Sequence, residues 1–296
     1  DLKCFEILER LRKEMDIPVW HDDQQGTAAV VAAGLINALK FVGKDIDKAH
    51  VCMVGAGAAN MAIFRIIVAA GIKAENVIIC DSKGMLGTGR TELKGTYKWD
   101  ICEKTNKWGR AGSTGEAFKD MDVCLAASSP GPGTVKPEWV STMAKDSIVF
   151  ATANPIPEIW PWEAKEAGAR IVATGRSDFD NQVNNSLGFP GIFRGALDVN
   201  AKTITDEMCI AAALELAKVA EDKGLREDYI IPNMNEWEVF PREAVAVGMK
   251  AIEQGIARIH HTKEELMEKA EIAIRGSREM VHLLMDNKLI PPAPEE

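Results

Sequence analysis

The feature that most constrains the fold is a short apolar run followed by two glycines and then by a helical pattern. Residues 50–54 (HVCMV) favour a β-strand, Gly55 and Gly57 come directly after them, and residues 58–70 favour a helix. In this context the first glycine permits a tight turn, and the second lets the backbone approach a pyrophosphate at the helix N-terminus. The segment therefore predicts the first strand, turn and helix of a dinucleotide-binding fold.

The rest of this motif leaves the choice of dinucleotide open. Its third position holds Asn60 rather than glycine or alanine, although Ala58 and Ala59 keep the turn small. Asp81 ends the next predicted strand, at about the distance where a carboxylate meets the adenosine ribose hydroxyls. The alternative for Asp81 is an ordinary turn residue. Lys83 lies close enough to indicate a 2′-phosphate, so both NAD and NADP remain candidates.

Apolar runs then alternate with helical patterns along the chain. Short helices are expected at 137–144 and 162–168. The runs that favour strands are 76–80, 122–127, 147–151 and 170–174. Strands that alternate with helices at this spacing indicate a parallel, doubly wound sheet. The predicted fold class is therefore α/β, a Rossmann-like NAD(P)-binding domain with flanking N- and C-terminal helices.

Two adjacent carboxylates, Asp22 and Asp23, lie just before a helix predicted for residues 27–42. This helix is apolar on nearly every face, so it should be buried rather than half exposed. Carboxylates at the end of a buried helix are costly to desolvate unless a partner such as a divalent cation pairs with them. Taken alone, the pair fits a surface turn or a helix N-cap better than a metal site.

Polar side chains follow two later strands of the predicted sheet. Asn154 comes after the strand at 147–151, and Pro155 restricts it to an extended conformation. Asn185 belongs to a polar run, 175–185, that follows the last strand. Open α/β sheets bind ligands at the carboxyl ends of their strands, although a turn asparagine and a solvated loop explain these residues equally simply. The candidate cofactor-binding residues are Gly55, Gly57, Ala58, Ala59, Asn60, Asp81, Ser82 and Asn154.

Helical patterns flank the predicted sheet on both sides. Residues 4–15 are amphipathic, and further helices are expected at 207–223, from 241 to about 257, and from 263 to about 287. The predicted organisation is a helical segment with the acidic motif (1–43), a Rossmann domain (44–200), C-terminal helices that pack back on the core (201–290) and a disordered tail (291–296).

The charge and the cysteines exclude several classes of function. The net charge is −9 and no run of Lys and Arg forms a basic patch, so we expect no nucleic-acid partner. No apolar stretch reaches membrane-spanning length, and the first residues do not resemble a signal peptide. The six cysteines are scattered without a C-x-x-C pair, which indicates reduced thiols and a cytoplasmic protein.

Four motifs occur in a fixed order: HDDQQGTA, VGAGAAN, ANPIPEI and NQVNNSLGFPGIFRGALD. With them the chain resembles malic enzyme, in its short prokaryote-type form, from residue 1 to about residue 260. The resemblance covers the C-terminal, cofactor-binding part of that family. It implies oxidative decarboxylation of malate to pyruvate and carbon dioxide with reduction of NAD or NADP, dependent on Mg²⁺ or Mn²⁺. The family's N-terminal domain, which supplies a catalytic Tyr and Lys, is not in this sequence.

The same resemblance implies roles for particular residues. Asp23 corresponds to a metal ligand, and Asp22 to an acidic neighbour with a role in proton transfer. Asn154 and Asn185 correspond to amides that contact substrate or nicotinamide. Asp1 corresponds to a second metal ligand, although the Glu that normally precedes it is missing and the link to the first helix is about three residues short. The family usually forms homodimers or larger assemblies.

Two other functions fit the residues. A metal-independent Rossmann dehydrogenase, for example one that acts on amino acids, would share the glycine turn but would not need Asp23. A non-catalytic module that senses dinucleotides would bind without any response to metal, malate or pyruvate. The ordered polar set Asp22, Asp23, Asn154 and Asn185 argues against such a sensor, which has no obvious use for paired acids facing a cofactor.

Overall fold

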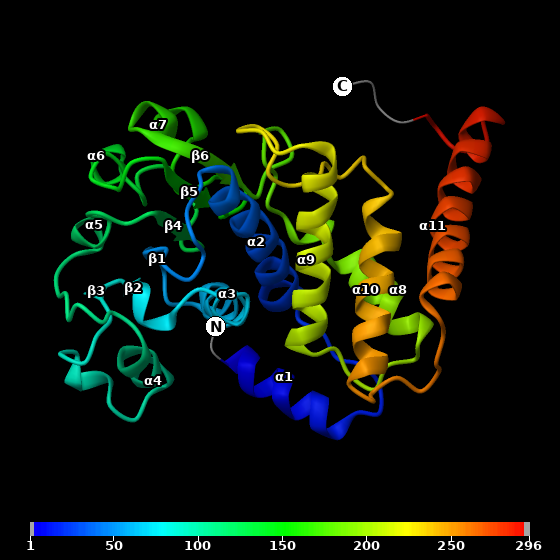
Figure 1. The fold of residues 1–296 in the computed structure, drawn as a ribbon, viewed down its shortest axis with the longest axis horizontal. Coiled ribbons are helices and arrows are strands. Elements are labelled where there is room, and N and C mark those ends of the chain that lie inside the picture. The colour runs from blue at the N-terminus through cyan, green and yellow to red at the C-terminus, as the bar shows by residue number, and fades with distance from the viewer. Residues whose placement is uncertain (1–2, 293–296) are drawn as a thin grey trace.

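A computed structural model describes residues 3–292 of the chain, and its sheet forms one half of the molecule (Figure 1). The six strands lie in the order β3-β2-β1-β4-β5-β6, and every pair is parallel except β2 with β3. The strands are β1 Val51–Val54, β2 Val77–Asp81, β3 Gly84–Met85, β4 Val123–Ala126, β5 Ser147–Ala151 and β6 Ala169–Thr174. The predicted α/β fold with a parallel sheet is confirmed, and all five predicted strands are present.

Helices cover both faces of the sheet, because alternate strand residues point into two separate cores. On one face Met53, Leu125 and Phe150 pack in the larger core with helices α2 (Asp22–Phe41) and α3 (Ala58–Ala69). The other face packs against three short helices, α5 (Thr114–Ala117), α6 (Pro137–Val140) and α7 (Pro161–Glu166). Strands buried on both sides need continuous apolar runs, which is the pattern that the sequence shows.

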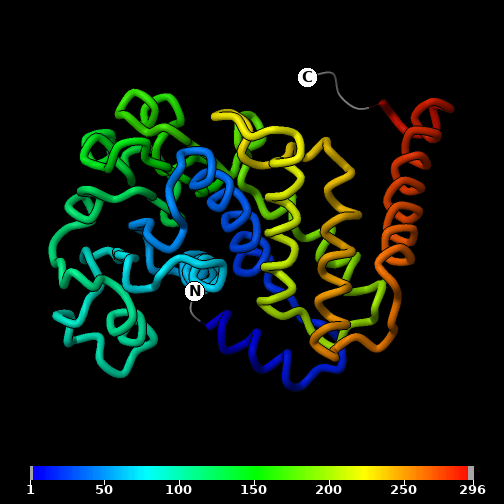
Figure 2. The backbone as a smooth tube through the Cα atoms, in the orientation of Figure 1, coloured from blue at the N-terminus to red at the C-terminus, as the bar shows by residue number. Residues whose placement is uncertain are grey.

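Of the remaining helices, α8 to α11 build the other half of the molecule, whereas α4 lies on the side of the sheet and α1 runs along the bottom of the view (Figures 1 and 2). These helices are α1 Lys3–Glu14, α4 Tyr97–Lys104, α8 Phe189–Asp198, α9 Asp206–Lys223, α10 Val239–Glu253 and α11 Lys263–Asp286, with short 3₁₀ turns at Ala74–Asn76, Thr91–Leu93 and Asn185–Leu187. Helix α2 lies between the sheet and α9, where the Asn37 amide donates to the carbonyls of Ala217 and Ile230, both at 2.9 Å. It is therefore buried on nearly every side, as predicted.

Several predicted helix boundaries were wrong. Helix α2 begins at Asp22 rather than at residue 27, because Gln24 and Gln25 are buried and the two acids favour a helix N-terminus. Helix α8 was not predicted at all, since its sequence FPGIFRGALD contains a proline and two glycines. The proline lies in the first turn, where no intrahelical donor is lost. Strand β3 was not predicted. Helices α6 and α10 end earlier than predicted, at Val140 and Glu253.

Three features bear on other predictions. Within residues 3–292, no helix combines the length and apolarity needed to cross a membrane. All six cysteines are free, and five are buried. Asp1 and residues 293–296 of the predicted tail lie outside the described residues, so the structure gives no position for them.

Candidate dinucleotide and substrate site

The glycine turn after β1 opens into a groove of about 710 Å³ at the carboxyl edge of the sheet. Gly55 has a φ of +104°, and a Cβ added there would lie only 2.8 Å from the Ala127 carbonyl oxygen. A side chain is therefore excluded by both conformation and space. Gly57, at the N-cap of α3, faces open space in the groove. Asp81 and Ser82 line the same groove from the end of β2.

Asn60 explains why the motif departs from a third glycine. Its side chain is fully buried, and its Nδ2 donates to the carbonyls of Val54 at 2.7 Å and Gly55 at 2.9 Å. These bonds tie the first turn of α3 to the end of β1. Asn60 therefore stabilises the turn from behind, whereas Ala58 and Ala59 keep the start of α3 small.

Asp81 is held by cations that the sequence did not predict. Its carboxylate pairs with Lys98 at 2.8 Å and with Arg90 at 3.2 Å, and it accepts the Lys83 backbone N–H at 2.9 Å. Burial raises the pKa of Asp81, but these hydrogen bonds outweigh it and hold the pKa below its usual value. Lys83 thus contributes its backbone, and the charges beside Asp81 come from the 3₁₀ turn region and from α4.

A second, smaller cavity of about 260 Å³ adjoins the groove, and Ala127 and Ser128 line both. Asp23 from α2, Asn154 after β5 and Asn185 after β6 all line this cavity. The loops after β5 and β6 meet at Gly175, where an added Cβ would lie 2.9 Å from Asn154 Nδ2. Within the loop after β6, the Gly175 carbonyl accepts the Asn184 amide at 2.8 Å. Residues separated widely in the sequence thus converge next to the dinucleotide groove, at the edge of the sheet where ligands of open α/β folds bind.

Asp22 lies beside this cavity rather than in its lining. Its carboxylate accepts the Trp20 indole N–H at 3.1 Å and lies over Gly26, where a Cβ would be 2.1 Å from Asp22 Oδ1 and 3.2 Å from Asn185 Cβ. Gly26 therefore lets Asp22 approach Asn185. Burial and the neighbouring Asp23 raise the pKa of Asp22, although the Trp20 hydrogen bond opposes this. A carboxyl group with a raised pKa is suited to proton transfer.

Comparison with known proteins decides the family. The family model described as "Malic enzyme, NAD binding domain" matches residues 24–252. The chain belongs to the malic enzyme family. It is 48% identical over 266 residues to the bifunctional malic/malolactic enzyme of Bacillus subtilis, and 46% identical over 256 residues to the NAD-dependent malic enzyme of Geobacillus stearothermophilus. These matches cover 90% and 86% of the chain.

Solved structures agree. The malic enzyme of Entamoeba histolytica matches 98% of the chain with a TM-score of 0.95 and 51% sequence identity. The malic enzyme of Pyrococcus horikoshii matches 96% of the chain with a TM-score of 0.90 and 49% sequence identity. The chain spans 64% and 52% of the two bacterial relatives, and 61% and 66% of the two solved chains. It therefore corresponds to roughly half to two thirds of these malic enzymes.

The site offers hard oxygen donors for a divalent ion. Asp23 is an exposed carboxylate, and the side-chain amides of Asn154 and Asn185 line the same cavity. Carboxylate and amide oxygens suit Mg²⁺ and Mn²⁺. Within the described residues, however, no three His, Cys, Asp or Glu side chains cluster closely enough to hold a metal ion. Asp23 therefore fits as one ligand of an incomplete set.

Glu158, in the ANPIPEI motif, is a residue that the sequence reasoning missed. It is fully buried, and its carboxylate accepts the backbone N–H of Ser128 at 2.8 Å and of Ala153 at 3.1 Å. Burial raises its pKa, while these hydrogen bonds partly offset the rise. The carboxylate thereby joins the loops after β4 and β5, whose residues Ser128 and Asn154 line the smaller cavity. The only signal in the sequence was an acid inside an otherwise apolar and proline-rich run.

We expect Glu158→Gln to loosen both loops, because glutamine offers one acceptor oxygen where two N–H groups need one each. Leaving a buried donor unpaired should lower the free energy of unfolding by about 1–3 kcal/mol. Dinucleotide affinity should fall several-fold, measured by calorimetric titration beside thermal unfolding. Glu138→Gln, an exposed acid on nearby α6, is the matched control and should change neither. Unchanged stability and affinity in Glu158→Gln would show that the carboxylate does not position these loops.

Proposed function

We propose that this chain provides the cofactor-binding part of an enzyme that oxidatively decarboxylates (S)-malate to pyruvate and carbon dioxide, with reduction of NAD or NADP. The observation that carries the proposal is the junction of two spaces. A groove begins at the glycine turn, and a polar cavity with Asp23, Asn154 and Asn185 adjoins it. A dinucleotide in the groove would bring its nicotinamide to the cavity, where a small polar acid fits.

Each site residue has a proposed role. The turn at Gly55 and Gly57 holds the pyrophosphate at the N-terminus of α3. Asn154 and Asn185 orient the nicotinamide and the substrate carboxylates, so that the hydride leaves the hydroxyl carbon of malate towards C4 of the nicotinamide. Asp22 takes part in the proton transfer at the hydroxyl group. Asp23 binds Mg²⁺ or Mn²⁺, and such an ion would supply charge stabilisation at the substrate oxygens. Asp1 is proposed as a second ligand.

The proposal can be tested by comparing malate with succinate, which lacks only the hydroxyl group. We expect the chain, saturated with NAD⁺ or NADP⁺ and Mn²⁺, to bind malate at least about tenfold more tightly than succinate, because a site built around a hydroxyl rejects an analogue without it. Calorimetric titration measures both affinities. Equal affinity for the two acids would contradict a malate site and would favour a metal-independent dehydrogenase or a dinucleotide sensor.

The cations beside Asp81 support a further prediction about the cofactor. Lys98 and Arg90 lie next to a carboxylate proposed to meet the ribose, where they can also pair with a 2′-phosphate. Lys98→Ala should weaken NADP⁺ binding by about tenfold and NAD⁺ binding by much less, since the phosphate loses one of its two cations while the Asp81 carboxylate still repels it. Lys94→Ala removes a nearby lysine that lies over Trp99 instead, and it serves as the control. Equal losses for both cofactors in Lys98→Ala would rule out this role.

The surroundings of the enzyme are also proposed. Five buried, free cysteines suit a reducing compartment, so we place the protein in the cytoplasm. We further propose that it works as a homodimer or a larger homo-oligomer.

A further inference from the structure

The last helix, α11, leaves the body of the molecule after its first turns. Only Leu266 and Ala270 are buried among its residues, and these pack near α10 and α8. Every residue from 275 to 283 is exposed, so this part of the helix is open on all sides. Figures 1 and 2 show α11 at the outer edge of the molecule, at the end farthest from the sheet.

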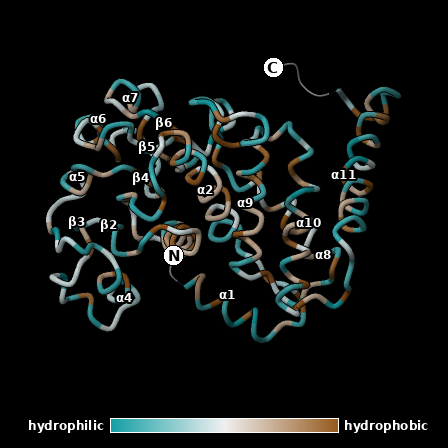
Figure 3. The backbone as a smooth tube through the Cα atoms, in the orientation of Figure 1, coloured by the Kyte–Doolittle hydropathy of each residue, from teal (hydrophilic) through white to brown (hydrophobic). Residues whose placement is uncertain are grey.

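This exposed part carries large apolar side chains, whose contact with water is unfavourable. Five of the six residues from 280 to 285 are apolar, and Met280, Leu283 and Leu289 are 63%, 61% and 71% exposed. Figure 3 shows the alternation of teal and brown along this helix. A helical end of about 12 residues is marginal alone in water, and Gly276 weakens it further. The helix therefore needs a partner surface.

The charges of α11 indicate what that partner is. Residues 263–271 carry four carboxylates and two lysines, whereas residues 275–288 carry three basic and two acidic side chains. The helix is thus acidic at its start and basic further along. A helix dipole alone does not account for this, because Arg275 and Arg278 lie well before the last turn. Two copies of α11 running antiparallel would place each basic part against the acidic part of the other.

In one antiparallel register, two arginines of each copy lie opposite two glutamates of the other copy. If the two-fold axis passes near Ala273, Arg275 of one copy lies opposite Glu271 of the other, and Arg278 lies opposite Glu268. Symmetry repeats both pairs. Within residues 3–292, neither Arg275 nor Arg278 forms an ion pair with an acidic side chain. Arg275 lies over the Trp237 ring, 5.3 Å from its centroid, and it too has no acidic partner within the described residues. Both guanidinium groups therefore lack a carboxylate partner that a second copy can provide.

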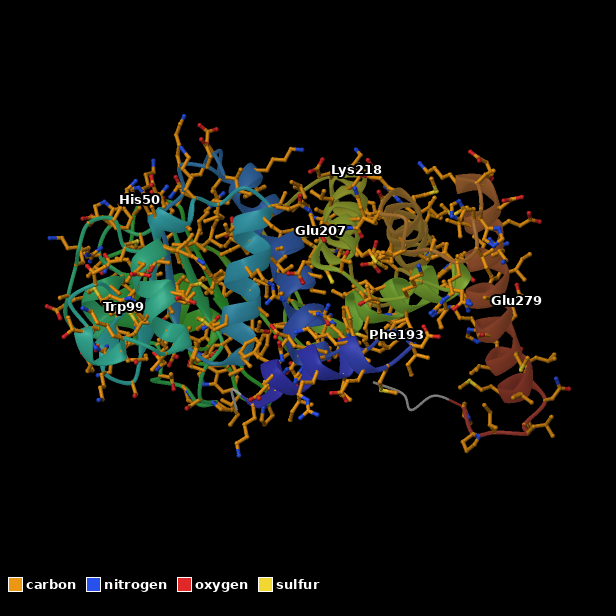
Figure 4. The ribbon with its side chains drawn as sticks, turned by 90° about the horizontal axis from the view of Figure 1, so that it is seen from below. His50, Trp99, Phe193, Glu207, Lys218 and Glu279 are labelled. Carbon is orange, nitrogen blue, oxygen red and sulfur yellow. The ribbon has the colours of Figure 1, made fainter. Side chains whose placement is uncertain are left out.

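An apolar face lies beside α11 to receive the second helix. On α8, Phe193 is 36% exposed and Leu197 is 63% exposed, and Phe193 packs edge-on against Trp20. Figure 4 labels Phe193 and Glu279 at the end of the molecule away from His50 and Trp99 on the sheet side. An arm that crosses from a second copy could cover this face and leave the dinucleotide groove open.

We infer that α11 is a self-association arm. Residues 275–289 of one copy pack antiparallel along α11 of a second copy and against the exposed side of α8. The arrangement is isologous, which is the commonest symmetry of soluble dimers. The inference deepens the proposed homodimer but uses none of the residues assigned to malate or dinucleotide binding. An experiment that disproves the self-association arm would therefore leave the proposed malate and dinucleotide site untouched, and the reverse also holds.

Sedimentation equilibrium of the 296-residue chain tests the inference. The wild type should sediment as a dimer, at twice its 32.3 kDa mass. Leu283→Glu and Met280→Glu should each raise the dimer dissociation constant by about 100-fold or more, because each replaces an apolar contact with a charge that the interface would desolvate. Leu214→Glu, at a position on α9 that is 53% exposed, is the matched control and should remain dimeric. Unchanged circular dichroism and dinucleotide affinity would establish that each variant is folded.

The charge register can be tested separately. Arg278→Glu should weaken the dimer, and adding Glu268→Arg should restore it, since the two residues exchange signs across the axis. In wild type, amide exchange at 276–283 should slow as the protein concentration rises, whereas in Leu283→Glu it should stay fast. A monomeric wild type at tens of micromolar, or a dimer that Leu283→Glu leaves intact, would overturn the inference. Failure of Glu268→Arg to rescue Arg278→Glu would reject the register near Ala273.

Discussion

Replacing Gly55 with alanine is expected to abolish measurable dinucleotide binding. The φ of +104° suits glycine, and the new Cβ would lie 2.8 Å from the Ala127 carbonyl oxygen, which belongs to the backbone and cannot rotate away. The turn must therefore move out of the geometry that holds a pyrophosphate. We expect a dissociation constant at least about 30-fold higher and an unfolding free energy lower by about 1–3 kcal/mol, measured by calorimetry and denaturant titration.

Two other glycines serve as controls that distinguish the effect of backbone strain from the effect of crowding the ligand. Gly168 has nearly the same φ, +105°, but faces open space in the turn before β6, so Gly168→Ala should lower stability and leave binding intact. Gly57 has a φ of −90° and also faces open space, so Gly57→Ala should keep stability but weaken binding by crowding the pyrophosphate. If Gly55→Ala bound dinucleotide as tightly as the wild type, the groove at the glycine turn would not be the dinucleotide-binding site.

Asp23→Asn has the second large expected effect. Asp23 is the carboxylate that faces the polar cavity, and among residues 3–292 no cluster of three potential ligands could replace it. An amide keeps the size of the side chain but removes its charge. We expect Mn²⁺ binding in the presence of malate to weaken by about 100-fold, while dinucleotide binding without metal is unchanged. Titration calorimetry with Mn²⁺ at fixed malate and dinucleotide measures this change.

An exposed acid elsewhere provides the control for this substitution. Asp47 lies in the turn before β1 and pairs with Lys73 at 3.5 Å, where both side chains are more than half exposed. Asp47→Asn should therefore alter neither metal binding nor stability appreciably. Metal and malate that bind Asp23→Asn as tightly as wild type would favour the metal-independent dehydrogenase over the malic-enzyme site.

Much of the fold could be predicted because the sheet is buried on both faces. Runs such as 147–151 (SIVFA) are continuous and apolar, and each is bounded by turn residues, so the strands were found nearly to the residue. The site could be anticipated in outline for a related reason. Parallel strands end at one edge of the sheet, so the polar residues after them, Asn154 and Asn185, were expected to lie near the glycine turn.

What escaped prediction depends on tertiary contacts. The sequence does not reveal that Glu158 joins two loops, or that Lys98 reaches Asp81 from a separate helix. Helix α8 contains residues that disfavour helices, and packing against α10 stabilises it instead. There Glu243 is fully buried, and burial raises its pKa well above the usual value. A charged residue in an amphipathic helix is normally expected on the exposed face, so the sequence gave no sign that Glu243 is buried.

The most direct test of the account is calorimetric titration of the chain with NAD⁺ and with NADP⁺, each with and without Mn²⁺ and malate. We expect at least one dinucleotide to bind, and its affinity to increase when metal and malate are both present, because the groove and the cavity share Ala127 and Ser128. The cofactor that binds more tightly is the preferred one. Dinucleotide binding that is indifferent to metal and malate would contradict the proposed malate site, and absence of dinucleotide binding would contradict the groove itself.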